Sequence, residues 1–167
     1  MAGRAPRTPS RPSAAPAGRF AVVAARFNEA ISKKLADGAM AALGEGGVGP
    51  ERVDVHWVPG SFELPLAAMT LARTRRYAAI VCVGVVIRGE TPHYEYVASA
   101  AAQGLSRVAL ETRVPVTFGV ITSLTEEQAW ERAGGSVGHR WEDAARAALE
   151  MAGWMRGARA SRRSGRR

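Results

Sequence analysis

The chain has 167 residues, 47% of them hydrophobic, and a net charge of +8, which is the size and composition of one globular domain. The charge comes from the two ends: residues 1–18 hold three arginines and residues 156–167 hold six, with no acidic residue in either segment. Residues 19–155 are close to neutral, which argues against a folded nucleic-acid-binding domain, and we interpret the ends as disordered basic tails.

Apolar runs and helical spacings alternate through the middle of the chain. This alternation predicts parallel strands joined by right-handed crossovers, hence an α/β fold with an open doubly wound, mainly parallel four-stranded sheet flanked by helices, of the flavodoxin-like kind. The capping box Thr125-Glu126-Glu127-Gln128 marks one helix start. The expected strands are 20–25, 53–58, 79–87 and 114–121, and the expected helices are 29–43, 61–75, 94–111, 125–133 and 141–155.

Polar and aromatic residues gather where the predicted strands end. The four segments are 26–28, 59–63, 87–93 and 118–119. Ligands of open parallel sheets bind outside the carboxyl ends of the strands. We therefore expect these segments to meet at one edge of the sheet and to form a binding site there.

The segment Arg88-Gly89-Glu90-Thr91-Pro92-His93 carries the strongest chemical signal. It follows a buried strand and opens a helix, where free backbone N–H groups bind anions such as phosphate. An imidazole exchanges protons near neutral pH, so His93 is the candidate acid–base group. The alternative is that His93 only caps the helix.

Four other side chains have both a functional and a structural interpretation. Phe27, Phe62 and Phe118 stand where a flat heteroaromatic ring could stack, although each would also suit a core. Glu63 either accepts hydrogen bonds from a polyhydroxy substrate or is a helix-start carboxylate. Arg132 taken alone is an ordinary helix-end cation.

The sequence predicts neither a metal site nor a cofactor. The histidines at 56, 93 and 139 lack cysteine or carboxylate partners at ligand spacing, and neither common nucleotide-binding glycine motif is present. No apolar run is long enough to cross a membrane, and the N-terminal segment lacks the apolar centre of a secretory signal. The single Cys82 permits no internal disulfide, so we expect a core thiol in a cytoplasmic protein.

Four segments, in order and at family spacing, resemble the 6,7-dimethyl-8-ribityllumazine synthase family over about residues 19–155. They are Arg26-Phe27-Asn28, Val58 to Pro65, Gly84 to Tyr94, and Glu131-Arg132-Ala133-Gly134. The resemblance implies a step of riboflavin synthesis without a cofactor. In it, 5-amino-6-(D-ribitylamino)uracil condenses with 3,4-dihydroxy-2-butanone 4-phosphate to the lumazine, with release of phosphate and water.

The same resemblance implies roles for individual residues. His93 would transfer protons, Glu90 and Thr91 would bind the phosphate through the turn, and Arg132 would pair with phosphate across a subunit boundary. Phe118 would close a neighbour's site, so that the active unit is a pentamer. The residues expected to hold the ribitylaminouracil are Phe27, Ser61, Phe62, Glu63, Phe118 and, through their backbone, Val85, Val86 and Ile87.

The chain departs from the family pattern after Gly134. Many relatives have a lysine where this chain has Ser136, and Ser136 does not supply the cation for that supporting phosphate contact. At a second position of the pattern, Arg140 preserves the cation. The short 134–139 connection resembles relatives whose pentamers build a hollow sixty-subunit shell.

Two other functions remain open. One is a shell protein of the same fold that binds flavin or lumazine without turnover. The other is an RNA-associated protein, whose nucleic-acid binding would reside in the basic tails.

Overall fold

The computed structural model describes the backbone of residues 17–164, so most of the predicted N-terminal tail (1–18) lies outside the described residues. Four strands alternate with five α-helices and two short 3-10 turns, η1 and η2. In chain order the elements are β1 (Arg19–Ala25), α1 (Glu29–Glu45), η1 (Pro50–Arg52), β2 (Val53–Val58), η2 (Ser61–Glu63), α2 (Leu64–Arg73), β3 (Tyr77–Ile87), α3 (His93–Thr112), β4 (Val116–Ser123), α4 (Glu126–Arg132) and α5 (Arg140–Ser164).

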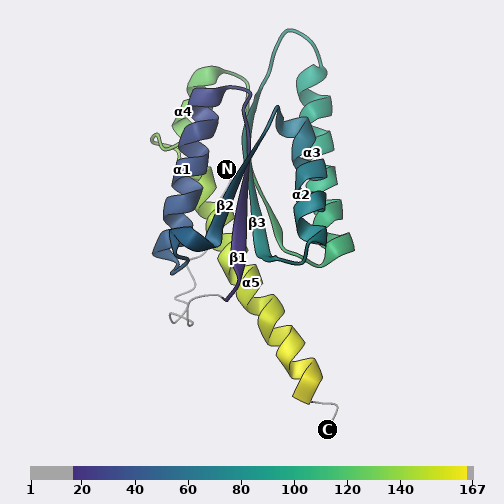
Figure 1. The fold of residues 1–167 in the computed structure, drawn as a ribbon. Coiled ribbons are helices and arrows are strands. Elements are labelled where there is room, and N and C mark those ends of the chain that lie inside the picture. Colours follow the sequence, from purple (N-terminus) through teal and green to yellow (C-terminus); the bar gives the residue numbers. More distant parts are fainter. Residues whose placement is uncertain (1–16, 165–167) are drawn as a thin grey trace.

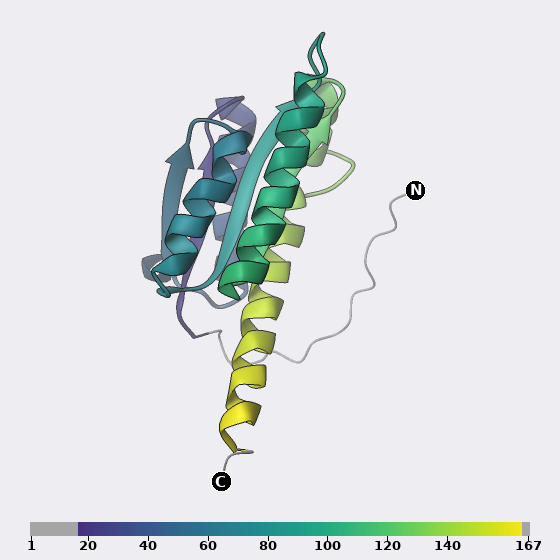
Figure 2. The ribbon, with the colours of Figure 1, turned by 90° about the vertical axis from the view of Figure 1, so that its right-hand side faces the viewer.

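The strands form one sheet in the order β2-β1-β3-β4, and every pair is parallel. The helices cover both faces: α1, α4 and α5 lie on one side, and α2 and α3 on the other (Figure 1). This confirms the predicted open doubly wound α/β fold. The strands end at the same edge, where the β3–α3 connection rises above the sheet (Figures 1 and 2).

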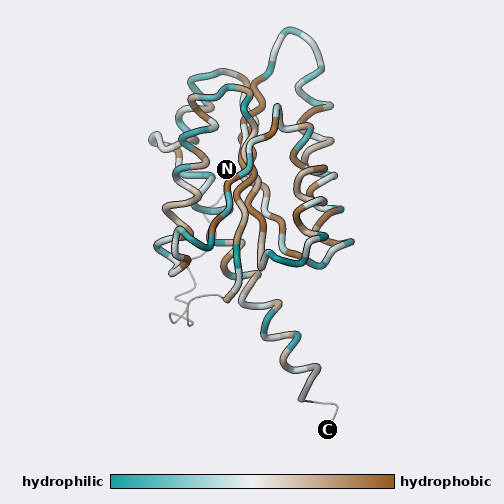
Figure 3. Tube along the Cα trace, in the orientation of Figure 1, coloured by the Kyte–Doolittle hydropathy of each residue, from teal (hydrophilic) through white to brown (hydrophobic). Residues whose placement is uncertain are grey.

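Two cores lie on the two faces of the sheet because alternate side chains of a strand point to opposite sides. In β1, Phe20 and Val22 join the core under α1 and α5, while Ala21 and Val23 join the core under α2 and α3. The central strands β1 and β3 are therefore apolar on both faces, as the hydropathy colouring shows (Figure 3). That two-sided burial is what makes their sequences continuous apolar runs.

The fourth strand is shifted from its predicted range. It begins at Val116 rather than at 114 and continues to Ser123, and the proline at 115 contributes only its carbonyl, which accepts from Ile80 N–H at 2.9 Å. Phe118 is the third residue of this strand and pairs with Cys82, five residues before the strand ends at Ser123. The expectation that Phe118 stands at the carboxyl end of its strand was wrong.

The last helix continues past its predicted end at Met155 as far as Ser164. Alanine and arginine favour helix, and Gly157 is the only strong helix-disfavouring residue between Met155 and Ser164. Residues 156–164 are helical, contrary to the disordered tail that we expected there. The end of α5 projects beyond the amino-terminal edge of the sheet (Figure 2). Among the described residues, no helix has both the length and the hydropathy needed to cross a bilayer.

A polar clamp formed by Arg19, Asp54 and Tyr77 joins the amino-terminal ends of β1, β2 and β3. Arg19 Nε donates to Asp54 Oδ2 at 3.1 Å, a terminal guanidinium nitrogen donates to Oδ1, and the Tyr77 hydroxyl donates to Oδ2 at 2.8 Å. The hydrogen bonds from Arg19, followed by the one from Tyr77, lower the pKa of Asp54 to about 2. Folding thus favours the ionised carboxylate.

Replacing Asp54 with asparagine is expected to lower the Tm by about 2 to 4 °C at neutral pH, a modest effect because the clamp is partly exposed. The folded pKa lies below the unfolded value, so the contribution is full above about pH 4. It is lost as the pH falls toward about 2. Melting curves from about pH 6 to about pH 3 should therefore show the two proteins converging. A Tm difference between the parent and Asp54→Asn that stayed constant with pH would contradict this account. The control is Asp37→Asn, because Asp37 belongs to an exposed ion pair.

Candidate active site

The first turn joins β1 to α1 and carries Phe27. The backbone N–H of Arg26 donates to Val58 O at 2.8 Å and that of Phe27 to Pro59 O at 3.1 Å, so the pairing of β1 with β2 continues past both strand ends. The buried Ser32 hydroxyl donates to Phe27 O at 3.0 Å and holds the turn on α1. The Phe27 side chain is 72% exposed, so its ring is presented outside the core.

The second turn, from Pro59 to Glu63, lies against the central strands β1 and β3 near the carboxyl edge of the sheet. Ser61 is buried, and its hydroxyl has no hydrogen-bond partner among the described residues. It lies over Gly84 of β3, because a Cβ at Gly84 would come within 2.8 Å of Ser61 Oγ. Phe62 is exposed and Glu63 half-buried, with a carboxylate oxygen 3.1 Å from where a Cβ of Gly60 would stand.

The third turn joins β3 to α3. The N–H of Arg88 donates to Ser123 O at 2.9 Å, and beyond it the chain leaves the sheet. A small hollow of about 100 Å³ lies there, lined by Arg88, Glu90, Thr91, Pro92, Tyr94 and Glu95. His93 is the first residue of α3 and its side chain is exposed. The residues expected to bind phosphate and the residue expected to transfer protons therefore share one exposed helix start.

Just before this turn, β3 contributes the backbone that was expected to line a pyrimidine pocket. Val85 and Val86 are buried and Ile87 is half-buried. Because η2 contacts β1, β3 and α3, the structure brings the first three predicted segments to one edge of the sheet. Phe118 does not join them, since it lies in mid-strand on the edge strand β4, 45% exposed.

Arg132 lies apart from these three turns in space. It ends α4, which packs on the α1 and α5 side of the sheet, whereas the β3–α3 turn opens a helix on the other side (Figure 1). Its Nη1 donates to Gln128 O at 3.0 Å. Within one chain, the structure does not bring Arg132 to the third turn. Nearby, Ser136 makes two hydrogen bonds to the Glu131 carboxylate. The Ser136 backbone N–H donates to it at 3.2 Å, and the Ser136 hydroxyl also donates to it.

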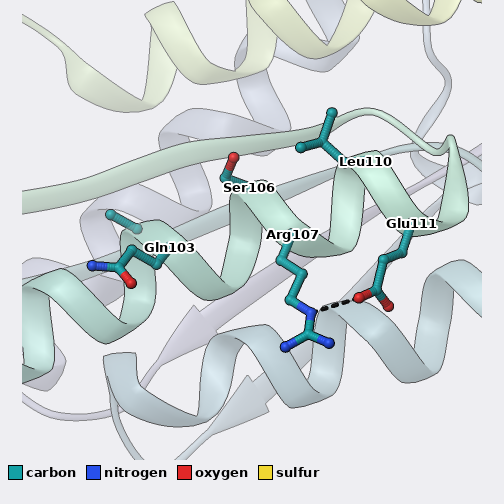
Figure 4. Close-up of a pocket in the computed structure, with 6 residues that line it drawn as sticks. Gln103, Ser106, Arg107, Leu110 and Glu111 are labelled. Carbon is teal, nitrogen blue, oxygen red and sulfur yellow. Dashed lines mark hydrogen bonds and ion pairs between the residues drawn. The ribbon is translucent and has the colours of Figure 1, made fainter.

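A larger hollow of about 600 Å³ lies away from the strand ends, on the outer side of α3 (Figure 4). Two of its lining residues, Arg107 and Glu111, form an ion pair with each other at 2.5 Å, and it contains none of the predicted site residues. Within the described residues no cluster of His, Cys, Asp or Glu could hold a metal ion. Burial raises the pKa of the Cys82 thiol, which is consistent with a core residue.

The family model for 6,7-dimethyl-8-ribityllumazine synthase matches residues 17–156. The chain belongs to the lumazine synthase family. This membership connects it to riboflavin biosynthesis and agrees with the flavodoxin-like sheet. The matched region contains all the segments described above and ends within α5.

Sequence reasoning missed one residue of this lumazine synthase fold, Gly84. It lacks a side chain in a strand of otherwise larger apolar residues, and the Ser61 turn occupies the space. A glycine inside a buried strand often marks the close approach of another segment, so the signal was present in the sequence.

Replacing Gly84 with alanine is expected to destabilise the protein by about 1–3 kcal/mol. The new Cβ would lie 2.8 Å from Ser61 Oγ and 3.0 Å from the Ala25 Cβ, so the Ser61 turn must shift. Urea unfolding at fixed protein concentration measures the effect. Gly153→Ala in α5 is the matched control, because its Cβ would meet no atom within 4 Å. Adding Ser61→Ala to Gly84→Ala should restore part of the loss, and a double variant no more stable than Gly84→Ala would contradict the contact.

Proposed function

We propose that the protein is a 6,7-dimethyl-8-ribityllumazine synthase. It condenses 5-amino-6-(D-ribitylamino)uracil with 3,4-dihydroxy-2-butanone 4-phosphate and releases phosphate. The observation that carries the proposal is the meeting of three turns at the carboxyl edge of the sheet, where the buried Ser61 hydroxyl has no hydrogen-bond partner in the part of the chain that the structure describes. A chain of this family with such an edge offers a hydrogen-bonding hydroxyl for a polyhydroxy substrate beside a helix start.

The ribitylaminouracil would lie across the first two turns. The exposed Phe27 ring stacks on the pyrimidine, and the Ser61–Glu63 turn holds the ribityl chain, with the free Ser61 hydroxyl and the Glu63 carboxylate bonding its hydroxyls. Phe62 covers the ring. The backbone of Val85, Val86 and Ile87 forms the wall of the pyrimidine pocket.

The butanone phosphate would lie at the start of α3. Backbone N–H groups at a helix N-terminus favour an anion, and Glu90 and Thr91 belong to the turn that forms this cradle. Arg132 would supply a charge-assisted contact to the phosphate from a neighbouring subunit. That arrangement accounts for the placement of Arg132 on the other side of its own sheet.

The chemistry requires positioning and proton transfer. The primary amine of the uracil attacks the ketone and loses water to give an imine. Phosphate then leaves, the adduct tautomerises, and the ribitylamino nitrogen closes the ring with loss of a second water. His93 would accept and return the protons of these steps, and the two binding turns would hold the reacting atoms together.

The active unit would be a pentamer. Because the 134–139 connection is short, as in relatives that form shells, twelve such pentamers would build a hollow sixty-subunit shell. Large apolar side chains that one chain leaves exposed support an assembly, because monomers rarely expose contiguous apolar surface. They include Phe27, Phe62, Leu66, Tyr96, Leu110, Phe118, Leu124 and Val137, and Trp57, Trp130, Met151 and Trp154 are exposed as well. Phe118, on the exposed side of an edge strand, would close the site of the adjacent subunit. Light scattering of the purified protein measures the assembly.

The test is to mix the purified protein with both substrates and to follow lumazine absorbance and phosphate release together. Equal amounts of lumazine and phosphate, formed faster than without protein, are expected. Tight binding of lumazine or flavin without product would instead support the shell protein that binds without turnover. No faster product formation and no binding would remove both functions.

A further inference from the structure

The final turns of α5 form a helical extension beyond the fold, which we define as residues 151–164 and call the α5 extension. Ala152 is the last buried residue of the helix, and every residue from Arg156 to Ser161 is exposed. The extension projects from the end of the sheet opposite the candidate active site (Figures 1 and 2). Most of it lies beyond the family match, which ends at residue 156.

The α5 extension is a concentrated source of positive charge. Glu150 is the last acidic residue of the chain, and residues 151–167 contain six arginines. Arg156 and Arg159 are three positions apart, so they are neighbours on one side of the helix. Among the described residues, no acidic side chain neutralises Arg156 or Arg159 in an ion pair, and their charges suit an anionic partner.

An exposed aromatic side chain accompanies the charge. Trp154 is 64% exposed and Met151, one turn earlier, is 42% exposed. Two large apolar side chains are too few for the wide apolar face with which a helix inserts into a membrane surface. Trp154 precedes Arg156 by two positions, so its indole projects from the other side of the exposed helix. An indole and arginines around one exposed helix are instead the combination with which proteins hold single strands, since bases stack on the ring while cations follow the phosphates.

We propose that the α5 extension binds single-stranded RNA. Arg156 and Arg159 contact successive phosphates on one side of the helix, and the strand continues round the exposed helix to Trp154, which stacks on an unpaired base. Binding of this kind depends on charge and stacking and has little sequence preference. It is independent of the proposed enzymatic function, because the extension and the candidate active site lie at opposite ends of the sheet.

The experiment measures fluorescence anisotropy of a labelled oligouridine of about 20 nucleotides with the full-length protein at several salt concentrations. Arg156→Gln/Arg159→Gln should weaken binding about 10-fold and reduce the salt slope by about 1.4, the value for two lost phosphate contacts. Trp154→Ala should weaken binding at least about 5-fold with an unchanged salt slope. Arg73→Gln/Arg107→Gln removes two exposed arginines from α2 and α3 and should stay within about 2-fold.

Three results would overturn the proposal. The first is equal weakening of RNA binding by Arg156→Gln/Arg159→Gln and by Arg73→Gln/Arg107→Gln, which would indicate an unspecific response to net charge. The second is unchanged binding in Arg156→Gln/Arg159→Gln or in Trp154→Ala. The third is binding to phosphatidylserine vesicles in a sedimentation assay without binding to oligouridine, which would identify a membrane surface instead. Far-UV circular dichroism of each variant verifies that the helix is retained.

Discussion

Replacing His93 with alanine is expected to lower kcat about 100-fold while the protein keeps its fold, because general acid–base catalysis by one positioned group typically contributes at least that much. His93 begins α3 with its side chain exposed, so the change creates no cavity in the core. The remaining rate would come from holding the two substrates together. Steady-state kinetics with both substrates saturating measure the loss.

His139→Ala is the matched control. His139 is also exposed and packs against the Trp141 ring at a centroid distance of 4.7 Å, on the side of the sheet away from α3. Its kcat should stay within about 2-fold of the parent. If both variants kept parental kcat, His93 would be only a helix-start residue, and proton transfer would have to be assigned to another group.

The sheet was predictable because its central strands are buried on both faces. Such strands read as uninterrupted apolar runs, and the carboxyl ends of β1 and β3, at Ala25 and Ile87, match the prediction. The helix start at Thr125 was equally clear, since its hydroxyl accepts from Gln128 N–H at 3.2 Å as the capping box requires. Local hydrogen bonding and burial determine these features, so local sequence reveals them.

The ends of β4 and α5 were harder to predict. Val114 is apolar and buried, but the proline that follows delays the start of β4 to Val116, and the strand continues past its predicted end to Ser123. Phe118 therefore lies far from the carboxyl end of its strand. Residues 156–164 were interpreted as a tail from their charge, although their helix propensity is high. In both places one local signal opposed another, and only the complete fold shows which prevailed.

The candidate site could be predicted only in part. Phe27, the Ser61 turn and His93 follow strand ends, so the topology of a parallel sheet brings them to one edge. Sequence spacing does not say that Ser61 rests on Gly84, because that contact joins segments from different crossovers. Nor could the pattern tell on which side of the sheet Arg132 lies, since that depends on the face that α4 covers.

The placement of Arg132 leads to the second large effect. Because His93 and Arg132 stand on opposite sides of the sheet within one chain, each proposed site takes them from two subunits. Arg132→Ala should raise the KM for the phosphorylated ketone at least about 10-fold, the cost of losing a charge-assisted contact. At low ketone concentration, His93→Ala and Arg132→Ala oligomers should each be nearly inactive. Oligomers formed by coexpressing the two variants should regain about one quarter of parental activity, because random assembly places both intact residues at that share of interfaces.

A second mixture distinguishes this arrangement from a site built within one chain. Coexpression of the parent with the double variant His93→Ala/Arg132→Ala gives about half of parental activity if both residues act from the same chain. It gives only about one quarter if each site needs two parental neighbours. Different affinity tags on the two chains allow mixed oligomers to be isolated. Activity near half in this mixture, with none regained by the two single variants, would place Arg132 and His93 in one subunit's site and contradict the shared arrangement.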